Sequence, residues 1–61
     1  MTAAPQDAPI LVKRYDRIRL YDTAAARYRT TDELRQWEKN GIPFVVIDTE
    51  TGDDITRVLL A

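Results

Sequence analysis

Six consecutive apolar residues, Ile42-Pro43-Phe44-Val45-Val46-Ile47, form the longest apolar run in this chain of 61 residues. The run is rich in β-branched residues after the proline, which favours a strand covered on both faces. We expect it to be the central strand of a sheet. It is much shorter than the roughly 18 apolar residues of a membrane span. The chain has room for one small domain, whose core will be marginal because about 60 residues bury only around 60% of the unfolded surface.

The composition excludes several classes of small protein. The chain has neither cysteine nor histidine, so disulfide scaffolds, common zinc sites and histidine-based catalysis are excluded. Residues 1–9 hold two prolines and three alanines, with no signal-peptide pattern, and are expected to be a flexible lead. Residues 10–61 are then expected to make up the folded domain. We also expect a cytoplasmic location and no membrane association.

A period of two runs through residues 17–21. Arg17, Arg19 and Tyr21 alternate with Ile18 and Leu20, which predicts a strand. One face of this strand would offer Ile18 and Leu20 to the core, and the other would display two guanidinium groups and a phenol.

The segment that follows predicts a hairpin. Asp22 can open a turn through 22–26, and Arg27-Tyr28-Arg29 can return as a short strand. Helix is the alternative, because Ala24-Ala25-Ala26 has high helix propensity. Three residues are too few to nucleate a helix, so the hairpin is preferred.

A capping box predicts the first helix. The Thr30 hydroxyl can accept a hydrogen bond from the Glu33 N–H, and the Glu33 carboxylate can accept one from the Thr30 N–H. The expected helix covers 32–39. Its core face carries Leu34 and Trp37, although Trp37 is also a candidate anchor for a partner.

Turn signals divide the remainder of the chain. Asn40-Gly41 ends the helix, and a turn over 49–52 ends in a glycine for which positive φ is expected. Residues 54–56 return as a short strand. Thr56 is then expected to cap a last helix through 57–60, whose apolar end is expected either to be cut short or to dock on a partner.

The two halves of the chain are alike. When Asp22-Thr23 is laid over Asp48-Thr49, Thr30 coincides with Thr56. Each half then reads as strand, turn, short strand and helix, which predicts a small α+β domain built from two ββα halves. The expected shared core consists of Leu20, Leu34, Phe44 and Val46.

Charge is unevenly distributed along the chain. Residues 13–29 hold six bases and two acids, a net charge of +4, whereas residues 30–61 carry −4. A basic strand face can pair with phosphates or guanine edges, although charge on an edge strand also prevents unwanted strand pairing. The expected DNA-binding residues are Lys13, Arg14, Tyr15, Arg17, Arg19, Tyr21, Arg27 and Arg29.

The acidic residues do not predict a catalytic or metal site. Asp22, Asp48, Asp53 and Asp54 could hold a divalent cation through oxygen ligands, but their neighbours make turn chemistry the stronger interpretation. No nucleophile is paired with a base. We therefore expect no enzyme activity, no metal and no cofactor.

Several segments together resemble a known family. The N-terminal DNA-binding domain of the polyhydroxyalkanoate (PHA/PHB) synthesis regulators has a similar order and spacing of motifs over nearly everything from Val12 onward. The resemblance implies a bacterial transcriptional regulator that binds promoter DNA and acts as a repressor. It rests on Lys13-Arg14-Tyr15, Arg19-Leu20-Tyr21-Asp22-Thr23, Arg27-Tyr28, Phe44-Val45-Val46-Ile47-Asp48 and Thr51-Gly52-Asp53-Asp54-Ile55-Thr56-Arg57.

The chain departs from this family in two respects. Asp16-Arg17-Ile18-Arg19 stands where the family typically has Pro-Asn-Arg-Arg, so Ile18 replaces one arginine and Arg17 supplies a base one position earlier. Family members also continue into a region associated with granule or polymer sensing. This chain offers no segment for that role, so granule or polymer binding is not carried over.

The small expected core favours self-association. We expect a homo-oligomer, a dimer or a tetramer. The alternative function is an oligomerisation or protein-docking module in which the basic strand meets an acidic partner. The expected interface residues are Phe44, Val46, Val58, Leu59 and Leu60.

Overall fold

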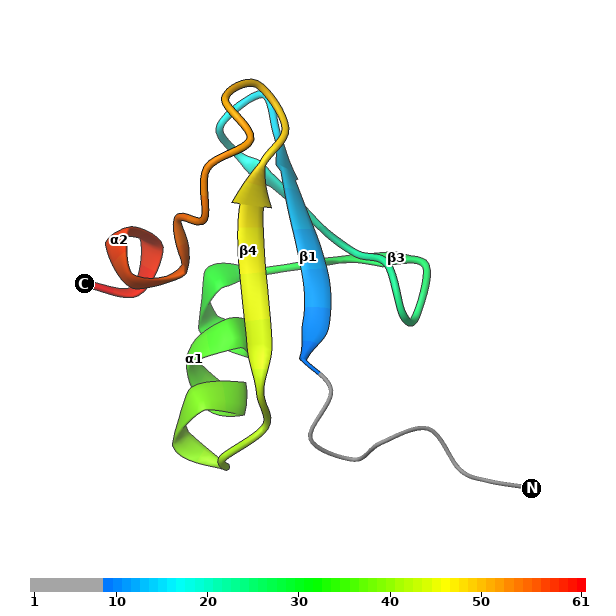
Figure 1. The fold of residues 1–61 in the computed structure, drawn as a ribbon. Coiled ribbons are helices and arrows are strands. Elements are labelled where there is room, and N and C mark those ends of the chain that lie inside the picture. Colours follow the sequence, from blue (N-terminus) through cyan, green and yellow to red (C-terminus); the bar gives the residue numbers. More distant parts are fainter. Residues whose placement is uncertain (1–8) are drawn as a thin grey trace.

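The computed structural model describes residues 9–61, so the lead expected over 1–9 lies, apart from Pro9, outside the described residues. The chain forms one small α+β domain, with two helices and a four-stranded mixed sheet in the order β3-β2-β1-β4 (Figure 1). In chain order the elements are β1 (Ile10–Tyr15), β2 (Arg19–Asp22), β3 (Arg27–Arg29), α1 (Thr31–Lys39), β4 (Phe44–Asp48) and α2 (Thr56–Leu60).

The predicted capping box begins α1. Thr30 is the N-cap, its side chain accepts from the Glu33 N–H at 3.2 Å, and the Glu33 carboxylate accepts from the Thr30 N–H at 2.9 Å. The helix ends at Asn40, and Gly41 follows with φ of 74°. The predicted helix and both of its terminal signals are confirmed, because each depends only on residues close in sequence.

The centre of the sheet differs from the prediction. The run at 42–47 supplies β4, which lies at an edge, whereas β1 lies between antiparallel β2 and parallel β4. The outer side of β4 is covered by the chain that follows it. Asp48 N donates to Asp53 O at 2.9 Å, and Ile55 N donates to Val46 O at 2.8 Å. These bonds serve backbone groups that would otherwise need a neighbouring strand.

The β1–β2 turn corrects the predicted strand at 17–21. Asp16 and Arg17 have φ of 53° and 65°, and consecutive positive φ values are typical of a type I′ hairpin turn. The strand therefore begins at Arg19. Ile18 lies in the turn with 79% of its surface exposed, so it does not join Leu20 in the core.

Both helices cover one face of the sheet. Leu34 of α1 is fully buried against Val12, and Leu59 of α2 packs against the same cluster. The Trp37 and Phe44 rings meet edge to face, 5.5 Å apart. Because side chains alternate along a strand, we call the side with Val12 the covered face and the opposite side the open face. The fully or nearly fully buried apolar side chains are Val12, Leu20, Leu34 and Val46.

The expected division into two ββα halves is not confirmed. The first half has the predicted hairpin, but where the second half was expected to return as a strand there is an isolated bridge between Ile47 and Asp54. Thr56 also does not cap α2, whose N-cap is Ile55. The Thr56 hydroxyl instead donates to Asp54 and accepts from the Val46 N–H, both at distances under 3 Å.

One turn residue carries a conformational cost that a substitution can remove. Ala26 has φ of 57°, a region that costs a residue with a Cβ about 1 kcal/mol. Ala26→Gly should raise the free energy of unfolding by about 0.5–1 kcal/mol, measured by urea denaturation. Ala24→Gly is the matched control, because Ala24 lies in the same turn without positive φ, and it should lower stability by about 0.5 kcal/mol. Equal effects of the two changes would contradict the assignment.

Candidate nucleic-acid interface

The open face is an ordered array set by the strand register. Lys13 pairs with Ile47 on one side and with Tyr21 on the other, and Tyr21 pairs with Tyr28, so one row crosses all four strands. Two shorter rows flank it, one from the pair Tyr15 and Arg19 and one from the pair Leu11 and Val45. The open face therefore consists of Leu11, Lys13, Tyr15, Arg19, Tyr21, Tyr28, Val45 and Ile47.

Its composition is distinctive. Among the strand residues that the structure describes, this face carries two cations and three tyrosines, and no carboxylate. The Tyr21 and Tyr28 rings meet edge to face with centroids 5.1 Å apart. The Arg19 guanidinium lies 6.0 Å from the Tyr28 ring centroid, within reach of a cation–π contact. Tyr28 is 53% exposed, so about half of its surface is accessible to a ligand.

Arg19 has one acidic neighbour, in the turn beyond the strand. Asp16 accepts a hydrogen bond from its Nη2, and this bond, followed by the charge of Asp16, raises the pKa of the Arg19 guanidinium. Both side chains are exposed. An exposed ion pair of this kind contributes little stability, so a phosphate can compete for Arg19.

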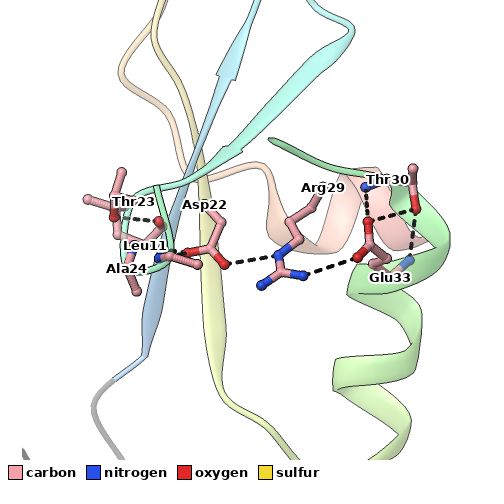
Figure 2. A network of polar contacts seen from close by, with 8 residues as sticks. Leu11, Asp22, Thr23, Ala24, Arg29, Thr30 and Glu33 are labelled. Carbon is pink, nitrogen blue, oxygen red and sulfur yellow. Dashed lines mark hydrogen bonds and ion pairs between the residues drawn. The ribbon is translucent and has the colours of Figure 1, made fainter. Parts of the chain in front are cut away.

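Arg29 lies on the covered face in a network of polar contacts (Figure 2). Its Nε donates to Asp22 at 3.0 Å and its Nη1 donates to Glu33 at 3.1 Å. Its guanidinium also lies 5.1 Å from the Trp37 ring centroid. The network joins β2, β3 and α1, which gives Arg29 a structural role in the fold.

Asp22, which is 1% exposed, organises the β2–β3 turn. Burial opposes its ionisation, but bonds from Ala25 N, Arg29 and Ala24 N together hold the pKa of its carboxyl below the ordinary value. The next residue continues the tether, because the Thr23 hydroxyl donates to the Leu11 carbonyl at 2.7 Å. The turn interpretation of Asp22 is confirmed.

Asp48 repeats this arrangement at the end of β4. The Arg14 guanidinium donates to its carboxylate at 2.6 Å and Glu50 N donates to it at 2.7 Å, and these bonds hold the pKa of Asp48 below the ordinary value. The Thr49 hydroxyl donates to the Arg14 carbonyl at 2.9 Å. Within residues 9–61, no group of three or more acidic residues is placed to hold a metal ion.

The eight side chains expected to bind DNA thus lie in different places. Lys13, Tyr15, Arg19 and Tyr21 share the open face, whereas Arg14 and Arg29 are held in ion pairs on the covered face. Arg17 lies exposed at the turn, 3.8 Å from Glu50. Arg27 lies at the β3 edge, on the covered side, and is exposed.

Tyr28 is the one tyrosine of the open face that the expected DNA-binding set did not include. Tyr28 stands between Arg27 and Arg29 in a strand, so it must point away from both arginines. The same period of two that placed Arg19 with Tyr21 could have identified it.

The expected oligomer-interface residues mostly serve the core of the monomer. Val46 is fully buried, and Phe44, Leu59 and Leu60 are half-buried against the core cluster. Val58 is 75% exposed. The apolar residues that face away from both helices are instead Leu11, Val45 and Ile47.

Comparison with known proteins identifies the family. The family described as "PHB/PHA accumulation regulator DNA-binding domain" matches residues 11–61. The chain belongs to this family. The resemblance to this family that the sequence motifs indicated is confirmed, and the family is one of regulator DNA-binding domains, not a family of enzymes.

Two relatives have similar sequences. An "Uncharacterized protein" of Allochromatium vinosum is 42% identical over 50 residues, which are 82% of this chain and 33% of the relative. The "Uncharacterized protein in phbA 5'region" of Thiocystis violacea is 40% identical over 50 residues, again 82% of this chain and 36% of the relative. The matched part of the chain thus spans about a third of the length of these relatives. No solved structure matches the chain.

None of the helices in the described part of the chain is long and apolar enough to cross a membrane.

The depressed pKa of Asp48 predicts a pH dependence of stability. A carboxyl whose folded pKa lies below its unfolded value of about 3.9 stabilises the fold above that pH, and the contribution is lost as pH falls through the folded pKa. Asp48→Asn should therefore lower the melting temperature at pH 7 and weaken the further decrease below about pH 4, measured by circular dichroism.

Asp53→Asn is the control for this variant. Asp53 is exposed in the same loop, and its carboxylate makes no hydrogen bond to the described residues. This change should leave the melting temperature at pH 7 near that of the parent protein. If Asp48→Asn melted at the parent temperature at pH 7, the Arg14–Asp48 pair would not stabilise the fold.

Proposed function

We propose that this domain binds promoter DNA through its open face, as a repressor-like transcriptional regulator of the cytoplasm. The observation that carries the proposal is the segregation of charge on the sheet. Lys13 and Arg19 lie on a face whose strand residues include no acid, although the chain as a whole has a net charge of −1. Membership of the DNA-binding family supports the same assignment.

The surroundings of this face extend the cationic surface. Arg17 is exposed at the turn that joins β1 to β2, next to the row of Tyr15 and Arg19. Phosphates attract such cations irrespective of base sequence, and the phenol groups of Tyr15 and Tyr21 can add hydrogen bonds to the backbone. Arg14 and Arg29 act indirectly by holding the sheet in shape.

A second candidate function rests on a different observation. Leu11, Val45 and Ile47 are apolar, and neither α1 nor α2, the helices within residues 9–61, covers their side of the sheet. A homo-oligomerisation or protein-docking module would bury these three side chains. In this alternative the basic row would meet an acidic partner and not DNA.

Anisotropy of a labelled duplex at several salt concentrations tests the proposal. The logarithm of the association constant should fall linearly with the logarithm of salt concentration, with a slope of about −0.9 for each phosphate contacted. The double variant Lys13→Ala, Arg19→Ala should bind more weakly and reduce the magnitude of this slope by about two.

Arg35→Ala, Lys39→Ala is the matched control. It removes the same charge from exposed positions of α1, which covers the opposite face of the sheet. This variant should bind the duplex nearly as tightly as the parent. Equal losses in the two double variants would overturn the open-face assignment. No binding at low salt by folded protein would overturn DNA binding and favour the docking module.

A further inference from the structure

We infer that the open face is a stacking platform for unpaired bases and therefore binds single-stranded DNA more tightly than duplex of the same sequence. The inference deepens the proposed function and rests on it, because it concerns the same face. The cations of this face attract any nucleic acid, whereas its tyrosines favour one with unpaired bases.

The breadth of the sheet argues against groove insertion. Neighbouring strands lie about 4.8 Å apart, so the four strands extend over roughly 14 Å before side chains are included. The major groove is about 12 Å wide and admits a helix or a two-stranded ribbon. The whole open face therefore meets a ligand as a surface, and a single strand can lie across it.

The three tyrosines lie close together on the open face, with Tyr28 exposed and Tyr15 and Tyr21 half-buried. Tyr21 lies at the centre of the long row, and its ring meets that of Tyr28, which is 53% exposed, edge to face. Tyr15 is on the next row, beside Arg19. Bases stack on aromatic rings with little sequence preference, and each such contact contributes about 1–3 kcal/mol.

The number of cations also favours stacking as the main source of affinity. A protein that makes about six to ten phosphate contacts binds duplex with a steep salt dependence, whereas the open face offers Lys13 and Arg19, with Arg17 in the adjacent turn. Lys13 pairs with Tyr21 in the strand register, and Arg19 pairs with Tyr15. A nucleic-acid backbone bound by these two cations would therefore hold its bases near the tyrosine rings.

Charge also argues against a second copy as the occupant of the whole face. Two open faces packed together would bring Lys13 and Arg19 of one copy near the same cations of the other, and Asp16 in the turn offsets Arg19 alone. A polyanion removes this repulsion, since each cation gains a phosphate.

The test compares a labelled strand of 15 nucleotides with the duplex of the same sequence, by anisotropy. The single strand should bind more tightly, with a salt slope of magnitude about two or less. Tyr28→Leu should weaken single-strand binding by about tenfold to a hundredfold. Tyr28→Phe should bind within about twofold of the parent, because the ring remains. Because Tyr28 is exposed, its substitution should leave the core intact. The fluorescence of Trp37, which packs against the core, reports whether each variant is folded.

The outcomes separate this inference from the proposed function. Tight duplex binding with weak single-strand binding would overturn the inference and leave the proposed function standing. No binding of either form by folded protein would overturn both. Single-strand binding that Tyr28→Leu leaves unchanged, or that Tyr28→Phe weakens as much as Tyr28→Leu, would overturn the stacking platform. A dimer in sedimentation that Leu11→Arg disrupts would place a second copy on the face and overturn it as well.

Discussion

Two buried aspartates tie the domain together at β1. Asp22 ends β2 and Asp48 ends β4, and each binds an arginine as well as the N–H groups of the turn after it. The threonine that follows each aspartate bonds a carbonyl of β1, at Leu11 in one case and at Arg14 in the other. The neighbours of the central strand are thus fixed at their ends by the same short motif. A core with so few fully buried apolar residues depends on such tethers.

Local signals allowed much of the fold to be predicted. The capping box at Thr30, the stop at Gly41 and the hairpin from β2 to β3 involve residues within a few positions of each other. The parallel pairing of β1 with β4 joins Ile10 to Phe44, and no local pattern encodes it. The apolar run at 42–47 has the composition of a central strand, although β4 lies at the edge of the sheet. The backbone of residues 53–55 covers its outer edge, and hydropathy does not distinguish this cover from a neighbouring strand.

The candidate site was predictable where period two applied within a strand. Alternation placed Arg19 and Tyr21 together, and it failed only where positive φ at Arg17 interrupts the strand. Counting charges could not separate the arginines that are exposed from those held in structural ion pairs. Arg14 binds an aspartate 34 positions away, and that partner emerges only when β4 is placed beside β1. Residue type therefore identified the candidate DNA-binding arginines, and tertiary contacts divide them into exposed residues and residues held in ion pairs.

The parallel pairing of β1 and β4 also has a consequence for synthesis of the chain. β2 and β3 can pair soon after they leave the ribosome, but the other side of β1 has no partner until residue 48 has emerged. Closing so long a loop costs entropy before any contact repays it. The nascent chain therefore carries an unpaired edge and an exposed Val12 until β4 has emerged, and such edges are where nascent chains aggregate.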